Sequence, residues 1–303
     1  MPRLCLISLE AHPQLVKGLV QELAAQELAV ELHNFPDGEH YVRLEGECKD
    51  AIVILVVGMR NPDQVLLPLI FLADLLHEMG ASKVVLVAPY LAYMRQDIRF
   101  KPGEAVSSRS FAAVLSAHID GLITVDPHLH RYHALSEIYQ VPALALSSTE
   151  LMADWIKAHI NMPVLVGPDA ESMQWVQAIA SVADLPYTVL HKIRRGDRDV
   201  EVSMPELDRW RDHTPVLIDD IISSGHTLLE TLHHLRSLAL PQAVCVAVHG
   251  IFAGEAYDLL RGFGVRDLVT SNSLQHPSNV LDLTPVLTRG IRSWVKEYVN
   301  EFS

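Results

Sequence analysis

The chain has 303 residues, of which 49% are hydrophobic and 20% are charged, and its formal net charge is −13. This length and apolar content predict about two globular domains, each able to bury a core, and they count against disorder. The acidic balance excludes nonspecific binding to nucleic acid, which needs a basic surface, but is compatible with a local basic pocket for a small phosphorylated molecule.

Short apolar segments alternate along the chain with segments of helical periodicity. Buried strands are predicted at 51–57, 84–88, 121–125, 164–166, 216–218 and 243–248. Helices are predicted at 64–79, 107–117, 172–180, 228–238 and 286–302. Continuous Val, Ile and Leu strands separated by helices are typical of parallel sheets covered on both faces. The sequence therefore predicts an α/β fold with mainly parallel sheets flanked by helices.

The best candidate for a domain boundary is segment 141–148, which contains one proline and two serines. A new helix is predicted from about residue 149. We therefore expect an N-terminal domain at 1–145 and a C-terminal domain at 146–303. Packing of the terminal helix back onto the first domain is an open alternative.

The cysteines Cys5, Cys48 and Cys245 are widely spaced and fit neither a disulfide framework nor a zinc-binding pattern. Two of them lie in apolar runs, which predicts buried thiols in a reducing compartment. The short apolar run at the start of the chain lacks a cleavage signature, and no segment is long enough to cross a membrane. These features predict a cytoplasmic protein that does not bind membranes.

The most informative segment is 216–227, Val-Leu-Ile-Asp-Asp-Ile-Ile-Ser-Ser-Gly-His-Thr. Its aliphatic start predicts a buried strand, Asp219 and Asp220 fall at the carboxyl end of that strand, and a Ser-Ser-Gly turn opens a helix. Ligands of open parallel sheets bind beyond the carboxyl ends of the strands, and a helix start with glycine and hydroxyl groups suits a phosphate. Adjacent carboxylates can also accept hydrogen bonds from vicinal sugar hydroxyls. The segment therefore predicts a sugar-phosphate site, with an ordinary capped helix as the alternative.

This segment resembles the signature of the phosphoribosyl-diphosphate-binding fold, which phosphoribosyltransferases and ribose-phosphate pyrophosphokinases share. Segments 35–39 and 89–104 are similar to the ATP-binding segments of the pyrophosphokinases, and 124–128, 167–169 and 191–194 match further segments in the same order. The resemblance covers nearly the whole chain, and its motif style is that of archaeal-type members. It implies two related phosphoribosyltransferase-type domains. It also implies transfer of the pyrophosphoryl group of ATP to the 1-hydroxyl of ribose 5-phosphate, giving phosphoribosyl pyrophosphate and AMP.

The same resemblance implies a role for each matching residue. The residues that would bind ATP are Phe35, Asp37, Glu39, Arg95, Gln96 and Asp97. Those that would bind ribose 5-phosphate are Asp219, Asp220, Ser223, Ser224, Gly225 and Thr227. His128 and Asp169 would contact Mg²⁺ or its waters, and Lys192 and Arg194 would be catalytic cations on a mobile loop. The family also implies a homo-oligomer whose subunits share the ATP site.

Some of these positions have simpler interpretations. From the residues alone, His128 is equally a capping or hydrogen-bonded histidine, and Asp169 could simply cap the helix that follows it. Glu171 and His226 depart from the family pattern near the sugar-phosphate segment.

Two other functions are compatible with part of the pattern. A phosphoribosyltransferase would share segment 216–227 but would not need segments 35–39 and 95–97. A non-catalytic regulatory member of the same family should have lost the loop cations or the acidic pair, and both are present. A P-loop kinase is excluded because no Gly-x-x-x-x-Gly-Lys-Ser/Thr string occurs.

Overall fold

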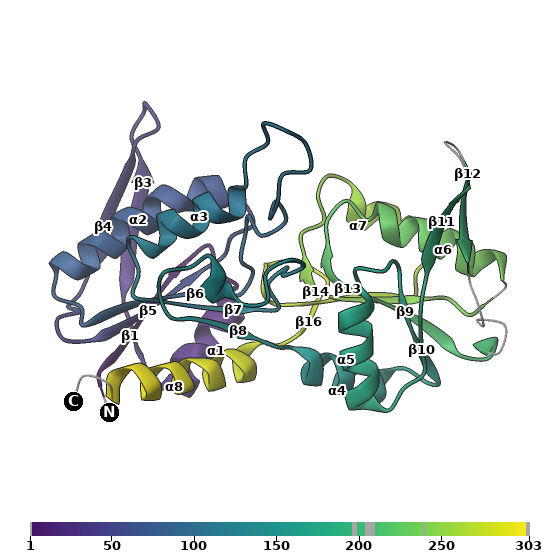
Figure 1. The fold of residues 1–303 in the computed structure, drawn as a ribbon. Helices are drawn as coiled ribbons and strands as arrows, with labels where there is room; N and C mark the ends of the chain where they lie inside the picture. Colours follow the sequence, from purple (N-terminus) through teal and green to yellow (C-terminus); the bar gives the residue numbers. More distant parts are fainter. Residues whose placement is uncertain (1, 196–198, 204–209, 239, 301–303) are drawn as a thin grey trace. The chain divides into compact units, whose positions relative to one another are not determined.

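The computed structural model describes the backbone of residues 2–195, 199–203, 210–238 and 240–300, and the side chains of 2–190, 210–238 and 240–297. The chain divides into two compact units (Figure 1). The first unit contains the residues up to Ser147, the short segment Ser273–Gln275 and the chain from Asp282 onwards. The second unit contains Ser148–Asn272 and His276–Leu281. The C-terminal helix is therefore part of the first unit.

The first unit is built on a six-stranded parallel sheet with the strand order β2-β1-β5-β6-β7-β8. Its strands are β1 Leu4–Leu9, β2 Gln26–Glu27, β5 Ile52–Val57, β6 Lys83–Ala88, β7 Gly121–Val125 and β8 Ala143–Leu146. The helices are α1 Pro13–Leu23, α2 Pro62–Glu78, α3 Ser107–Ser116 and α8 Thr284–Asn300, with a 3-10 turn, η1, at Leu135–Glu137. Helices α2 and α3 cover one face of the sheet, and α1 and α8 cover the other (Figure 1). An antiparallel hairpin of β3 Ala29–Asn34 and β4 His40–Glu45 projects from this unit.

The second unit repeats this architecture. Its six-stranded parallel sheet has the order β10-β9-β13-β14-β15-β16. The strands are β9 Pro163–Gly167, β10 Tyr187–Val189, β13 Thr214–Ile222, β14 Val244–Gly250, β15 Asp267–Ser271 and β16 Asn279–Leu281. The helices are α4 Thr149–His159, α5 Met173–Ala183, α6 His226–Ser237 and α7 Ala256–Phe263. A hairpin of β11 His191–Arg195 and β12 Asp199–Ser203 occupies the same place in the chain order as β3 and β4. The prediction of two related, mainly parallel domains is confirmed.

Strand β13 is longer than the sequence predicts. The aliphatic run ends at Ile218, but parallel pairing with β14 continues through Asp219 and Ile221 to Ile222. The acidic pair therefore lies within the strand, with the backbone of both residues fixed by the sheet. Within the described part of the chain, no helix combines the length and the apolar character needed to cross a membrane.

The C-terminal helix α8 packs closely against the sheet of the first unit. A Cβ added to Gly121 would lie 2.4 Å from Cζ2 of Trp294, and one added to Gly290 would lie 2.5 Å from Cδ1 of Leu146. Trp294 is only 2% exposed, so its indole has little room to move away. Glycine is thus required at both positions for this approach of helix and sheet.

Replacing Gly121 with alanine should therefore lower the free energy of unfolding by about 1–3 kcal/mol, the usual cost of overpacking a core. Urea denaturation measures this difference. The matched control is Gly262→Ala in α7, where the added Cβ would meet no atom within 4 Å. That change should raise stability by about 0.5–1 kcal/mol, because alanine is the better helix former. An unchanged denaturation midpoint for Gly121→Ala would contradict the close packing of α8.

Asp120, just before β7, links α2 and β6 through its carboxylate. The backbone N–H of Val84 and the ammonium of Lys83 donate to it at 2.8 and 3.1 Å, and Nε2 of His77 lies 3.0 Å from Oδ2. Partial burial alone would raise the pKa of Asp120, but these hydrogen bonds outweigh that effect and hold the pKa below its usual value. The ionised form is therefore the one that stabilises the fold.

The substitution Asp120→Asn should lower the free energy of unfolding by about 1–2 kcal/mol at pH 7. Because the folded-state pKa is depressed, this contribution is present above the unfolded pKa of about 3.9 and is lost as the pH falls through the folded value. Urea titrations between pH 7 and pH 3 should show the two proteins converging at the acid end. Asp74→Asn, which removes the half-exposed pair with His118, is the control and should change stability by less than about 0.5 kcal/mol. A gap that stays constant to pH 3 would rule out the proposed role of the ionised carboxylate.

Candidate active site

Three carboxylates gather at the carboxyl ends of β9 and β13 in the second unit. Asp169 follows β9, and Asp219 and Asp220 lie in the last part of β13, which pairs with β9. Asp220 is 3% exposed, and its backbone N–H donates to Oδ1 of Asp219 at 3.0 Å. Burial, and then the charges of Asp220 and Asp169, raise the pKa of Asp219 well above its usual value. The cluster is therefore electrostatically unfavourable without a cation or hydrogen-bond donors.

This donor set fits a hard divalent cation. Mg²⁺ is bound in proteins through one or two carboxylates and keeps several of its waters, and a positive ion would offset the mutual repulsion that raises the pKa of Asp219. Hydroxyl groups of a sugar would satisfy the same carboxylates by donating hydrogen bonds. The carboxylates thus suit a metal, a polyol or both.

The carboxylate of Asp169 also orders the turn that leads into α5. Its Oδ1 accepts hydrogen bonds from the backbone N–H groups of Glu171 and Ser172, each at 3.1 Å. The hydroxyl of Ser172 donates to the carbonyl oxygen of Asp169 at 2.6 Å. The N-cap of α5 is Ser172, so Asp169 orders the turn before the helix and does not cap the helix itself, and these bonds fix the orientation of its carboxylate. Glu171 and His226, the two departures from the family pattern, are both exposed.

A tight turn connects β13 to α6. Gly225 precedes the first residue of α6 and has φ = 73°, a conformation that favours glycine, and a Cβ there would lie 3.3 Å from Cδ1 of Leu260. The backbone N–H of Ala253 donates to the carbonyl of Ser223 at 3.0 Å, which fastens the turn to the loop after β14. Ser224 is exposed, and Thr227 lies in the first helical turn. Because the first N–H groups of a helix have no acceptor within it, this turn suits a phosphate.

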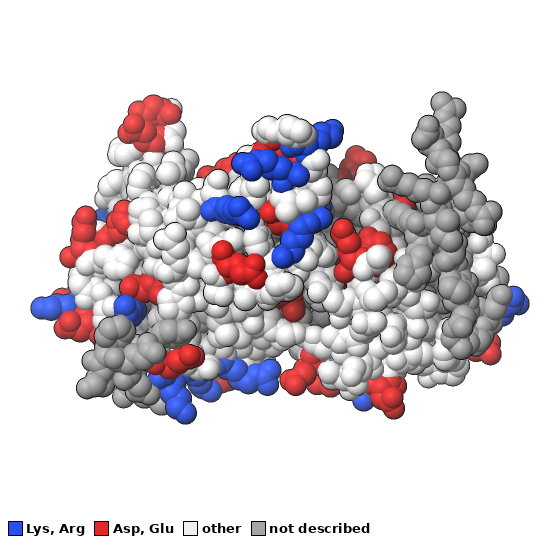
Figure 2. All heavy atoms as spheres, viewed as in Figure 1, with Lys and Arg blue, Asp and Glu red and all other residues white. Residues whose placement is uncertain are grey.

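The basic loop between β6 and α3 carries Arg95, Gln96 and Asp97. Figure 2 shows Lys and Arg side chains gathered over this loop. Arg95 is exposed, whereas Nε2 of the half-buried Gln96 donates to the carbonyl of Ile98 at 3.2 Å. Asp97 differs from both, because it is 3% exposed and accepts a hydrogen bond from Nη1 of Arg131 at 2.7 Å. The loop therefore presents Arg95 to solvent and holds Asp97 inside the unit.

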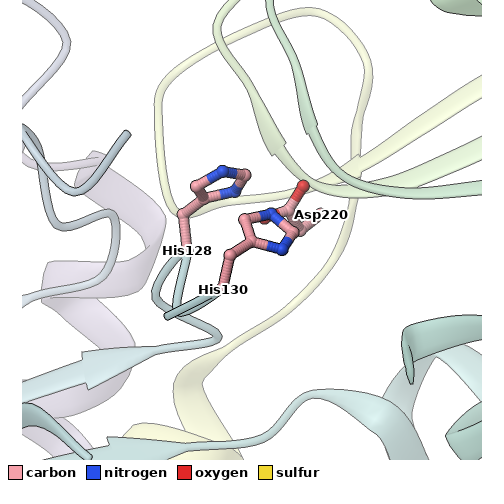
Figure 3. Close-up of side chains that lie close together, drawn as sticks. All are labelled: His128, His130 and Asp220. Carbon is pink, nitrogen blue, oxygen red and sulfur yellow. The ribbon is translucent and has the colours of Figure 1, made fainter. Parts of the chain in front are cut away.

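His128 and His130 follow β7, the strand next to β6 in the sheet. Their rings meet edge to face with centroids 4.0 Å apart, and both side chains are labelled in Figure 3. Asp126, at φ = 37°, turns the chain sharply out of the strand. The histidine loop and the basic loop thus leave neighbouring strands at the same edge of the sheet.

Residues 35–39 form the turn at the tip of the β3–β4 hairpin. The backbone N–H of Phe35 donates to the backbone carbonyl of Glu39 at 2.8 Å, and the backbone N–H of Glu39 donates to Oδ1 of Asp37 at 3.2 Å. All five residues are exposed, including the ring of Phe35 at 45%. The tip therefore does not enclose a ligand within its own unit.

Lys192 and Arg194 belong to β11, where they pair with Val202 and Val200 of β12. Their side chains lie outside the described residues.

Comparison with known proteins identifies the family. Residues 4–118 match the model of the N-terminal domain of ribose phosphate pyrophosphokinase, and residues 134–267 match that of the phosphoribosyl transferase domain. The ribose-phosphate pyrophosphokinase of Methanopyrus kandleri is 33% identical over 92% of this chain and 96% of its own. This chain belongs to the ribose-phosphate pyrophosphokinase family. The family's protein from Sulfurisphaera tokodaii is 32% identical over 87% of this chain and 92% of its own.

The fold agrees with this assignment. The crystal structure of phosphoribosylpyrophosphate synthetase from Mycobacterium smegmatis matches with a TM-score of 0.85, covering 97% of this chain and 99% of that one at 23% identity. The family resemblance inferred from the segments is therefore confirmed.

Several residues that shape the basic loop between β6 and α3 were not predicted from the sequence. Glu104 closes the loop, because its Oε2 accepts the backbone N–H groups of Phe100 and Lys101 at 2.7 and 3.0 Å. The Lys-Pro-Gly-Glu string offered a local signal for such a turn. Arg131 and Tyr132, which also bond to the loop, carried no signal, because their partners are distant in the sequence.

Proposed function

We propose that this chain is a ribose-phosphate pyrophosphokinase, an enzyme that transfers the pyrophosphoryl group of ATP to the 1-hydroxyl of ribose 5-phosphate. The products are phosphoribosyl pyrophosphate and AMP, and the role is in nucleotide biosynthesis. The observation that carries the proposal is the carboxylate cluster of Asp169, Asp219 and Asp220 beside the turn that opens α6, in a chain of this family.

Ribose 5-phosphate would bind to the second unit. The phosphate would accept hydrogen bonds from N–H groups at the start of α6 and from the hydroxyls of Ser223, Ser224 and Thr227, with Gly225 allowing close approach. The vicinal 2- and 3-hydroxyls would donate to Asp219 and Asp220. That interaction would satisfy the carboxylate pair that burial and repulsion leave in an unfavourable state.

ATP would bind mainly to the first unit, with Mg²⁺ as the cofactor. Arg95 and Gln96 would hold the nucleotide, and Phe35, Asp37 and Glu39 would contact its adenosine part. His128 and Asp169 are the proposed contacts to the ion or its waters. When bound, Mg²⁺ neutralises charge on the polyphosphate.

The reaction would be an in-line displacement. The ribose 1-hydroxyl oxygen forms a bond to the β-phosphorus, the bond from that phosphorus to the bridging α–β oxygen breaks, AMP leaves with that oxygen, and the hydroxyl proton passes to solvent. Lys192 and Arg194 would stabilise the negative charge on the transferring group, because such transfer depends chiefly on positioning and neutralisation.

The protein would work as a cytoplasmic homo-oligomer. The exposed tip of the β3–β4 hairpin is compatible with this, since residues 35–39 are accessible to a second copy of the chain. All three cysteines are free and buried, which suits a reducing compartment.

Product analysis by chromatography tests the proposal against its rival. With ATP and ribose 5-phosphate the protein should form AMP, whereas with phosphoribosyl pyrophosphate and adenine it should release no pyrophosphate. The reverse pattern would identify a phosphoribosyltransferase. Nucleotide binding without turnover of either mixture would indicate a regulatory member of the family.

A further inference from the structure

Asp97 and Arg131 form an ion pair between two loops of the first unit. Nη1 of Arg131 donates to Oδ1 of Asp97 at 2.7 Å, and the two side chains are 44% and 2% exposed. The guanidinium also lies over the ring of Phe100, with its carbon 5.3 Å from the centroid. A carboxylate buried this deeply needs a compensating cation. Arg131 supplies it from the loop after β7.

Tyr132 makes a second connection between the same segments. Its hydroxyl donates to the carbonyl of Asp97 at 3.1 Å and accepts from Nε of Arg109 at 3.2 Å. Oγ of Ser108 lies 3.4 Å from the same hydroxyl, and Tyr132 is only 9% exposed. The loop after β7 is thus tied both to the basic loop and to the first turn of α3.

We propose that Asp97, Arg131 and Tyr132 form a latch that positions two ligand-binding segments of the first unit. Arg95 and Gln96 immediately precede Asp97, and His128 lies three residues before Arg131. The latch therefore fixes the proposed nucleotide-binding residues relative to the proposed metal-binding histidine. This inference rests on the proposed function and assigns Asp97 a positioning role through Arg131 in place of a direct contact with ATP.

The geometry predicts an asymmetry between the two sides of the latch. Arg131→Met leaves the buried carboxylate of Asp97 without its cation, whereas Asp97→Asn leaves a half-exposed guanidinium that can turn to water. Arg131→Met should therefore lower the denaturation midpoint more than Asp97→Asn. Both changes break the same ion pair, so both should weaken nucleotide binding to a similar extent.

A double-mutant cycle tests the latch. Calorimetric titration with the Mg²⁺ complex of α,β-methylene ATP should show each single variant binding about 10- to 100-fold more weakly. The double variant should bind no more weakly than the weaker single variant, and Arg131→Lys should recover part of the loss. The KM for ribose 5-phosphate should stay within about twofold of wild type. Tyr132→Phe, which removes only a hydroxyl, should weaken nucleotide binding about threefold or more, even if Arg131→Met does not fold.

The control is Asp74→Asn, which breaks the pair between Asp74 of α2 and His118 after α3 and should leave nucleotide affinity unchanged. Unchanged affinity in Asp97→Asn and Tyr132→Phe would overturn the latch. Losses that multiply in the double variant would also overturn it, because they would show separate contacts with the nucleotide. A wild-type protein that binds the analogue but forms no AMP would refute the proposed function alone, since the titrations report on the latch without turnover.

Discussion

Asp219→Asn should lower kcat/KM for ribose 5-phosphate about 100-fold and, in the same protein, raise the stability of the ligand-free state. The loss of activity follows from removing a carboxylate that would accept a hydrogen bond from a sugar hydroxyl, since bonds to charged groups are the strong ones. The gain in stability follows because the amide cannot be charged. Burial and the charges of Asp220 and Asp169 make ionised Asp219 costly, as the raised pKa shows.

Urea denaturation at pH 8 without divalent cations, together with steady-state kinetics, measures both effects. Asp212→Asn, at an exposed position before β13, is the matched control and should change neither. An Asp219→Asn variant that is less stable than wild type would contradict the electrostatic description of the cluster. A variant with full activity would remove Asp219 from the sugar site.

Lys192→Ala should lower kcat about 1,000-fold while the KM values for both substrates change little. A cation that acts on the transferring group stabilises charge mainly in the transition state, and comparable cations in phosphoryl transfer contribute factors of about 10³ to 10⁵. Arg194→Ala changes a residue two positions further along β11 and should also lower kcat. The two variants should therefore be measured together.

Single-turnover measurements of AMP formation separate this effect from binding. Lys157→Ala changes an exposed lysine of α4 and should leave the rate unaltered, which controls for the loss of one positive charge from the second unit. If Lys192→Ala raised KM and left kcat intact, the lysine would be a binding residue and not a catalytic one.

Local patterns predicted the parallel sheets, because each central strand is a continuous aliphatic run that is buried on both faces. The β3–β4 hairpin escaped prediction for the opposite reason. Five of the six residues of β3, Ala29–Asn34, are exposed, so the strand has no continuous apolar run to mark it in the sequence. The length of β13 was also underestimated, because pairing with β14 extends it through two polar residues.

In the site, too, the local features could be predicted and those that depend on the packing of distant segments could not. Asp219, Asp220 and the turn at Gly225 lie within seven residues of one another, so one segment predicted their chemistry. The approach of Asp169 to Asp219 depends on β9 lying beside β13, which only the sheet order reveals. The pairing of Asp97 with Arg131 spans 34 residues and depends on how two loops pack, so no local pattern could reveal it.

The most direct test of the central claim is ³¹P NMR of the purified protein mixed with Mg²⁺, ATP and ribose 5-phosphate. The proposed reaction predicts an AMP resonance together with a sugar-linked diphosphate in equal amounts, and both should be lost when ribose 5-phosphate is omitted. Formation of ADP in place of AMP would contradict pyrophosphoryl transfer and indicate transfer of a single phosphoryl group.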